Sequence, residues 1–325
     1  MTDIRDIEAA AKRLSGISIT TPLLRSFELD QVAGGIVLLK PECLQVTGSF
    51  KIRGAYNFLS QLTEAEAKRG VVAWSSGNHA QGVAAAGRML GVPTAIVMPE
   101  DAPRAKLSNT RNLGGEVITY DRYSEDREAI ARSIAAERGA EVVPSYDHER
   151  IIAGQGTVGL EIAEQSVAMG LPTDQVLICC SGGGLASGSA IAIKHRLPAA
   201  SVHTVEPRDF DDMARSLDMG ERVHIENSAR SICDALQAHT PGELTFEIGR
   251  RLFGTGLSVS DEEVREAMRF AFRNLKLVIE PGGAAALAAV LSGKIETKGK
   301  TTVVVISGGN VDHELFAEIQ NSASG

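Results

Sequence analysis

The chain has 325 residues, 43% of them hydrophobic and 23% charged, and a formal net charge of -8 at pH 7. This length is enough for two compact lobes, each with its own core. The acidic balance argues against nucleic acid or an anionic membrane surface as the main partner. No stretch approaches the roughly 20 apolar residues of a membrane span, and the charged start, M-T-D-I-R-D-I-E, does not match a signal peptide.

Strands and helices alternate along most of the sequence. After a first amphipathic helix, which carries Ile4, Ile7 and Leu14 on one face, the patterns predict strands at 36–39, 71–74, 94–98, 116–119, 142–143, 175–180, 201–206 and 301–306. Helices are expected at 51–62, 78–90, 124–138, 151–164, 186–196, 243–252, 261–272 and 282–291, with another starting at Pro103.

This alternation predicts an α/β fold of two lobes, each a mainly parallel twisted sheet flanked by helices. We expect residues 53–145 to form a small domain inserted into a large domain made of residues 1–52 and 146–325. Ligands commonly bind between lobes, so we expect the site in that cleft. Four cysteines, Cys43, Cys179, Cys180 and Cys233, show no C-x-x-C spacing, which favours free thiols and a reducing cytoplasm.

The segment T-G-S-F-K-I-R-G-A, residues 47–55, places Lys51 at the start of a helix directly after a turn. The positive end of the helix dipole disfavours a protonated ammonium. The neighbouring Phe50 and Ile52 would partly desolvate the side chain, which lowers the pKa of a lysine. A lysine made neutral in this way can form a Schiff base. A surface lysine at a helix N-terminus is the alternative interpretation.

Two loops of small residues follow predicted strands, where open α/β sheets bind their ligands. In S-S-G-N-H, residues 75–79, Ser76 and Asn78 are suited to cap the next helix, and the N–H groups there would hold a carboxylate. In S-G-G-G-L, residues 181–185, consecutive glycines let the backbone approach an anion, so we expect a phosphate. The spacing matches neither the dinucleotide nor the nucleoside triphosphate motif. An ordinary helix cap and a tight turn are the alternatives.

Two further loops carry polar groups. S-G-G-N, residues 307–310, follows the most apolar predicted strand and places the Ser307 hydroxyl beside the other loops. E-P-R-D-F-D-D, residues 206–212, gathers carboxylates that suit a hard divalent cation, although helix capping and a solvated acidic face explain the spacing better. A lysine, a phosphate loop, a carboxylate loop and a neutral hydroxyl are the set that pyridoxal phosphate needs.

With these motifs the sequence resembles the serine/threonine dehydratase (threonine ammonia-lyase) and serine racemase family, which are fold type II pyridoxal-phosphate enzymes with a tryptophan synthase β-like fold. The resemblance covers nearly all 325 residues. It implies that Lys51 carries the cofactor next to Phe50, that Asn78 bonds its phenolic oxygen, and that Ser307 faces its ring nitrogen. Glu280 matches a motif close to the cofactor. The phosphate loop would comprise Ser181, Gly182, Gly183, Gly184 and Leu185.

The same resemblance implies a substrate site and a cation site. The substrate carboxylate would be received by Ser75, Ser76, Gly77, Asn78 and His79. As in racemase-type members, Mg²⁺, or Ca²⁺ or Mn²⁺, would be held by Glu206, the Phe210 carbonyl and Asp212. The phosphate loop of the family usually begins with glycine, where this chain has Ser181. We expect a homodimer, and because the chain ends at Gly325 we expect no C-terminal regulatory domain.

The implied reaction removes water from a 3-hydroxy amino acid, L-threonine or L-serine, and gives a 2-oxo acid and ammonia. A serine at the ring nitrogen supplies no negative charge to keep that nitrogen protonated, which favours elimination over transamination. Racemisation of serine or aspartate, with Ser76 as a second acid/base, is one alternative. Dehydration of 3-hydroxyaspartate or phenylserine is another, and a non-catalytic cofactor-binding protein is a third. We expect the discriminating residues in the region 218–242.

Overall fold

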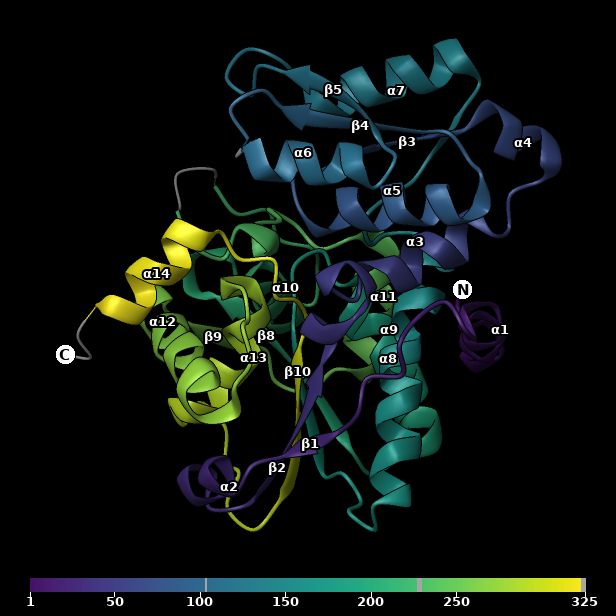
Figure 1. Cartoon of the computed structure of the whole chain (residues 1–325). Coiled ribbons are helices and arrows are strands. Elements are labelled where there is room, and N and C mark those ends of the chain that lie inside the picture. The colour runs from purple at the N-terminus through teal and green to yellow at the C-terminus, as the bar shows by residue number, and fades with distance from the viewer. Residues whose placement is uncertain (103, 227–229, 323–325) are drawn as a thin grey trace.

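The computed structural model describes residues 1–102, 104–226 and 230–322, whose strands form two separate sheets (Figure 1). The larger sheet has the order β1-β2-β10-β7-β8-β9 and is parallel except for the antiparallel β1–β2 pair. Its strands are β1 (Leu24–Arg25), β2 (Ile36–Pro41), β7 (Gln175–Cys179), β8 (Ser201–Pro207), β9 (Leu257–Val259) and β10 (Thr301–Ile306). The smaller sheet, β5-β4-β3-β6, is parallel throughout. It contains β3 (Val71–Trp74), β4 (Thr94–Pro99), β5 (Glu116–Tyr120) and β6 (Glu141–Val142).

Helices cover both sheets, so the predicted α/β architecture is confirmed. Those of the smaller lobe are α3 (Lys51–Leu59), α4 (Glu64–Arg69), α5 (Asn78–Leu90), α6 (Arg104–Asn112) and α7 (Arg127–Arg138). Those of the larger lobe are α1 (Ile4–Leu14), α2 (Phe27–Ala33), α8 (Glu149–Ala168), α9 (Gly184–Arg196), α10 (Asp212–Met219), α11 (Glu243–Leu252), α12 (Asp261–Phe270), α13 (Pro281–Leu291) and α14 (His313–Asn321). None of the helices in the described ranges is long and apolar enough to cross a bilayer.

Helices cover the small sheet on both faces, and alternate side chains of β3 pack against one face or the other. Val71 and Ala73 pack against α3 and α5, while Val72 packs against Ala131 and Ala135 of α7 on the other side. All four small-sheet strands lie within residues 53–145. The domain boundaries at 53 and 145 stay a prediction.

A buried ionic network holds α3, the helix that begins at Lys51, against the larger lobe. Arg53 is fully buried, and its guanidinium donates to Glu42 at 2.7 Å and to Glu161 at 2.6 Å. Lys40 also binds Glu161, at 2.6 Å. Since a buried charge needs a partner, this arrangement fixes α3 in one orientation. The orientation of α3 in turn fixes the position of Lys51.

Several predicted elements match the structure within a few residues, and others were missed. The predicted helix over 51–62 ends at Leu59, and the one over 124–138 begins at Arg127 because Asp126 caps it through the N–H groups of Glu128 and Ala129. The sequence reasoning missed the short elements α2, α4, α10, α14 and β9. Pro103, expected to start a helix, lies outside the described residues.

Candidate active site

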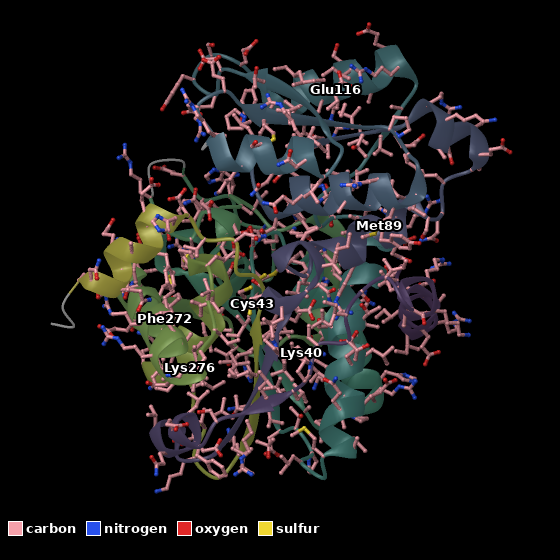
Figure 2. All side chains as sticks on the ribbon, viewed as in Figure 1. Lys40, Cys43, Met89, Glu116, Phe272 and Lys276 are labelled. Carbon is pink, nitrogen blue, oxygen red and sulfur yellow. The ribbon has the colours of Figure 1, made fainter. Side chains whose placement is uncertain are left out.

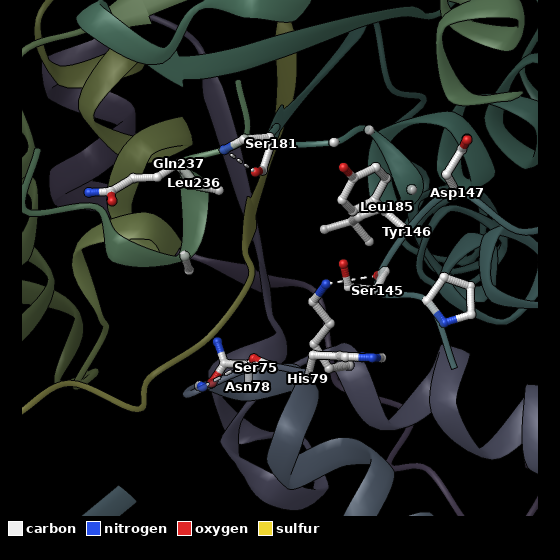
Figure 3. Close-up of a pocket in the computed structure, with 18 of the residues that line it drawn as sticks. Ser75, Asn78, His79, Ser145, Tyr146, Asp147, Ser181, Leu185, Leu236 and Gln237 are labelled. Carbon is white, nitrogen blue, oxygen red and sulfur yellow. Dashed lines mark hydrogen bonds between the residues drawn. The ribbon is translucent and has the colours of Figure 1, made fainter. Parts of the chain in front are cut away.

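A cavity of about 660 Å³ lies between the two lobes and collects three of the four polar loops (Figure 3). Its volume is in the range of small-molecule sites. Every residue that the sequence assigned to the cofactor or substrate lines it: Phe50, Lys51, Ser75, Ser76, Gly77, Asn78, His79, Ser181, Gly182, Gly183, Gly184, Leu185, Glu280 and Ser307. Glu206, Phe210 and Asp212 do not line it.

Lys51 lies at the first position of α3 with its amine inside the cavity. Its Nζ donates to the backbone carbonyl of Ser145 at 3.0 Å and lies 5.1 Å from the centre of the Phe50 ring. Burial lowers the pKa of Lys51 to about 8, with smaller opposing effects from Cys179 and Glu280. The turn before it is fixed because the Phe50 N–H donates to the Ser307 carbonyl at 3.1 Å. The expected lowered lysine pKa is therefore confirmed.

The glycine loop follows β7 and begins α9. Gly183 has φ +100°, and a Cβ there would lie 2.8 Å from Thr245 Cβ, so no other residue type fits without displacement. The backbone that precedes α9 is thus left bare at the positive end of a helix dipole, which suits an anion. The Ser181 hydroxyl accepts from the Ala238 N–H at 3.2 Å. The serine that replaces the family glycine therefore anchors the segment after the 3₁₀ turn Asp234–Leu236.

The S-S-G-N-H loop is built differently from the prediction. The N-cap of α5 is Gly77, with no side-chain hydrogen bond, so the expected capping by Ser76 and Asn78 was wrong. Asn78 instead donates from Nδ2 to Glu280 Oε1 at 2.6 Å, across to the larger lobe. His79 Nε2 lies 3.0 Å from the Val143 carbonyl, and burial lowers its pKa to about 3, so the ring is neutral.

Ser307, Cys179 and Glu280 line another part of the cavity and carry little charge. Ser307 is buried and its hydroxyl lies within hydrogen-bonding reach of the Cys179 thiol, whose pKa burial raises to about 11. Burial raises the pKa of Glu280 to about 7, with a further contribution from Asp234. A neutral serine and a neutral thiol thus lie at the position where the sequence placed the partner of a ring nitrogen.

The acidic segment lies one strand away from the glycine loop, at the end of β8. Both oxygens of Glu206 accept backbone N–H groups at the start of α10, from Met213 at 3.0 Å and Ala214 at 2.8 Å. Both oxygens of Asp212 are buried and have no hydrogen-bond partner in the described part of the chain. Burial raises the pKa of Asp212 to about 7 and, together with Asp212, raises that of Glu206 well above its ordinary value. In the ranges that the structure describes, no three His, Cys, Asp or Glu side chains group as a metal site.

Sequence reasoning missed several residues of the cavity wall. Tyr146 packs against Gly182 and Gly184, and Arg127 lies at the start of α7. Asn310 belongs to the recognised S-G-G-N motif, but only its contacts show a role. Arg127 and Tyr146 carried no motif signal. Of the region 218–242, Arg222 and the segments 234–238 and 240–242 line the cavity, while residues 227–229 lie outside the description.

Comparison with known proteins shows the family to which the chain belongs. The family described as "Pyridoxal-phosphate dependent enzyme" matches residues 14–308, and the chain belongs to that family. It is 44% identical to an L-threo-3-hydroxyaspartate ammonia-lyase of Pseudomonas sp, over 98% of each chain. It is 42% identical to a serine racemase of Schizosaccharomyces pombe, over 96% of this chain and 95% of the other. The crystal structure of a T.th. threonine deaminase superposes with a TM-score of 0.91 at 41% identity, covering 95% of this chain and 99% of the other.

The protein is therefore a fold type II, pyridoxal-phosphate-dependent enzyme of the ammonia-lyase class, as the sequence predicted. The residues present fit the cofactor, because the cavity combines a lysine of lowered pKa with a bare backbone at a helix N-terminus.

Proposed function

We propose that this enzyme is an ammonia-lyase whose preferred substrate is 3-hydroxyaspartate, which it converts to oxaloacetate and ammonia. L-Threonine and L-serine are then the poorer substrates. The observation that carries the proposal is the cation Arg127 in the cavity wall. The relative from Pseudomonas, which is named for this activity, supports it.

Apart from Lys51, which the cofactor would occupy, Arg127 is the cation of the wall that has no acidic partner among the described residues. Lys106 pairs with Asp234 at 2.9 Å, Arg132 with Glu128 at 2.6 Å, and Arg222 with Glu243 at 3.1 Å. Within the described ranges no carboxylate lies within ion-pair distance of Arg127. A cation at the first position of a helix is also disfavoured by the helix dipole, so helix stability does not explain it.

The position of Arg127 suits the side-chain carboxylate of an acidic substrate. Arg127 lines the same cavity as Lys51, together with Tyr146, which packs against the glycine loop. Guanidinium groups bind carboxylates through paired, charge-assisted hydrogen bonds. Threonine and serine have no second carboxylate for this group.

We assign the remaining residues as the sequence suggested. Lys51 binds the cofactor, Gly182–Gly184 with Ser181 and Leu185 hold its phosphate, Asn78 donates to its phenolic oxygen, and Ser307 faces its ring nitrogen. Ser75, Ser76 and the N–H groups at the start of α5 receive the substrate α-carboxylate. Pyridoxal phosphate supplies the electron sink for the α-carbon. After the substrate amine has displaced Lys51 from the cofactor, Lys51 Nζ would be free to take the α-proton. The β C–O bond would then break, the hydroxyl group would leave with a proton as water, and the released enamine would hydrolyse to the 2-oxo acid and ammonia.

Racemisation of serine or aspartate is the second candidate. It rests on Ser76, whose side chain lines the same cavity as Lys51 and can serve as a second acid/base. The relative named serine racemase supports this alternative.

We propose a divalent cation at Glu206, the Phe210 carbonyl and Asp212. The support is the pair of buried, unpartnered oxygens of Asp212, because a cation would compensate a charge that no donor satisfies. The hydrogen bonds of Glu206 argue against a cation there, because both of its oxygens already accept backbone N–H groups at the start of α10.

We also propose a homodimer in the cytoplasm. Exposed apolar side chains on the larger lobe support the dimer: Leu44, Phe272 and Val278 are 49%, 45% and 47% exposed. Figure 2 marks Phe272 and Lys276 on this lobe, away from the smaller one. Light scattering of the purified protein measures the mass directly, and a monomer contradicts the dimer. The free thiols of Cys43, Cys179, Cys180 and Cys233 fit a reducing compartment.

The test of the main proposal is a substrate panel. Ammonia release is measured with the isomers of 3-hydroxyaspartate, with L-threonine, L-serine and phenylserine, and D-serine and D-aspartate are assayed in parallel. We expect kcat/KM for one 3-hydroxyaspartate isomer to exceed that for threonine by about tenfold or more. A preference for threonine or serine would reject the assignment of Arg127 and leave the enzyme class intact. Faster formation of the D-amino acid would favour the racemase.

A further inference from the structure

A series of side-chain hydrogen bonds links Thr47, Asn310, Asn78 and Glu280. The Nδ2 atom of Asn310 donates to the Thr47 carbonyl at 2.7 Å and to Oδ1 of Asn78 at 2.7 Å. Nδ2 of Asn78 in turn donates to Glu280 Oε1 at 2.6 Å. These bonds connect the turn before Lys51 and the loop after β10 to Asn78, the first residue of α5, which Figure 3 labels in the cavity wall.

The Thr47 carbonyl sets the orientation of the Asn310 amide. A backbone carbonyl has lone pairs and no hydrogen, so the Thr47 oxygen can only accept. The amide of Asn310 must therefore present its NH₂ group to Thr47. That group has two hydrogens, and the second reaches Asn78 Oδ1. Asn78 is then held with its oxygen toward Asn310 and its NH₂ group toward Glu280, and the bond to Glu280 uses only one of the two N–H groups.

The backbone at Thr47 is strained in a way that its side chain does not explain. Thr47 has φ +64°, a left-handed conformation that is unfavourable for a β-branched residue. Its hydroxyl is buried and finds no hydrogen-bond partner among the residues that the structure describes. A Cβ at the next residue, Gly48, would lie 2.5 Å from Asn310 Oδ1, so the turn packs directly on the amide of Asn310. What the strained turn does provide is a carbonyl aimed at Asn310.

We propose that Asn310 is a positioning residue for the cofactor. It fixes the orientation of the Asn78 amide so that an N–H group, rather than the carbonyl, meets the phenolic oxygen of pyridoxal phosphate. An N–H group stabilises an oxyanion, whereas a carbonyl oxygen repels it. The inference rests on the proposed role of Asn78 and holds whichever 3-hydroxy amino acid is the substrate.

The test measures cofactor binding rather than turnover. Apoprotein is titrated with pyridoxal phosphate for the wild type, Asn310→Ala and Asn310→Asp, and the absorbance of the bound cofactor is followed against pH. Loss of a hydrogen bond to a charged group predicts about tenfold or more weaker binding in both variants. The midpoint of the absorbance titration should rise because the phenolate loses its donor. Asn112→Ala, at an exposed asparagine, is the matched control and should leave both quantities unchanged.

A double-mutant cycle separates positioning from a general structural effect. If Asn310 acts only through Asn78, Asn310→Ala should cost no further affinity in an Asn78→Ala background. Additive losses of affinity in the double variant would overturn the proposal. It would also be overturned if Asn310→Ala bound pyridoxal phosphate with the affinity and absorbance of the wild type. Unchanged binding in Asn78→Ala alone would reject the proposed role of Asn78 as well. Asn310→Asp keeps the side-chain volume and provides the same test if the alanine variant does not fold.

Discussion

The amine of Lys51 donates to the backbone carbonyl of Ser145 at 3.0 Å, and no carboxylate forms an ion pair with it in the part of the chain that the structure describes. A carbonyl is a weaker partner for an ammonium than a carboxylate is. Burial therefore dominates and lowers the pKa of Lys51 to about 8. The contact also joins α3 to the segment that leads into α8, so it brings the amine to the seam between the lobes.

Cofactor capture should depend on pH through Lys51. Only the neutral amine is nucleophilic, so the rate of pyridoxal phosphate capture by the apoprotein is expected to rise with pH and to level off above about 8. Stopped-flow absorbance measures this rate. Lys51→Ala should capture no cofactor covalently and release no 2-oxo acid, yet melt close to the wild type. A rate that does not change with pH, or covalent capture by Lys51→Ala, would assign the reaction to another amine.

Arg127 should decide the choice between acidic and neutral substrates. Arg127→Ala is expected to lower kcat/KM for 3-hydroxyaspartate by about 10- to 100-fold, because the side-chain carboxylate loses charge-assisted hydrogen bonds. Activity with threonine should change little. Arg132→Ala is the matched control, since Arg132 lines the same cavity but pairs with Glu128. An equal loss of kcat/KM for both substrates would show that Arg127 does not bind the side-chain carboxylate of 3-hydroxyaspartate.

Ser76 should separate elimination from racemisation. If its hydroxyl supplies a proton to the second face of the substrate, Ser76→Ala loses formation of D-serine or D-aspartate and keeps most of the ammonia release, since elimination uses Lys51. Both products are measured from the same incubation with the L-amino acid. An equal loss of the two activities indicates instead that Ser76 binds the α-carboxylate.

The carboxylates of Glu206 and Asp212 should make stability depend on pH and on metal. Their folded-state pKa values are raised, that of Asp212 to about 7, so the folded state binds protons more tightly than the unfolded state does. In chelator, the contribution of these two carboxylates to the free energy of unfolding is therefore expected to be highest below the ordinary carboxyl pKa and to fall as pH rises through about 7. Magnesium at about 100 times its Kd should restore about 2.7 kcal/mol.

Glu280 also has a raised pKa, of about 7, so Asp212→Asn is needed to isolate the cation site. This variant should lose the response to magnesium and part of the pH dependence. Thermal melting in chelator and in magnesium, at two pH values, gives the comparison. If the wild-type melting curve is the same with and without chelator, the proposed cation site is rejected. The role of Glu206 is then to accept the N–H groups at the start of α10.

Arg53 should be a large contributor to stability although it lies outside the cavity. Arg53→Met leaves the buried carboxylate of Glu42 without its main partner, and removal of one member of a buried ion pair costs about 3–5 kcal/mol. Urea denaturation measures the loss. Adding Glu42→Gln to Arg53→Met should recover much of it, since no uncompensated charge then remains. No recovery would mean that packing of the arginine stem, rather than its charge, holds α3 in place.

Much of the fold was predictable because it depends on local patterns. The strands at 71–74 and 301–306 and the helices at 78–90 and 243–252 agree with the structure, since each has an unambiguous hydrophobic period bounded by turn residues. The short helices α2, α4 and α10 were missed because six to eight residues give too little periodicity. The capping role of Ser76 and Asn78 was wrong because Asn78 bonds Glu280, a contact between residues 202 apart that no local pattern predicts.

The sequence by itself determined the succession of strands and helices, the loops that line the cavity and the lysine with a lowered pKa. These follow from the hydrophobic period, from glycine at bare backbone and from the residues beside Lys51. Only the tertiary structure decided which polar groups are paired. Three features depend on segments that are distant in sequence. Among the described residues, Arg127 has no acidic partner, Asp212 has no donor, and Asn310 joins Thr47 to Asn78. Their side chains meet only after both lobes have packed, so the partner of each polar group is fixed by the fold and not by its neighbours along the chain.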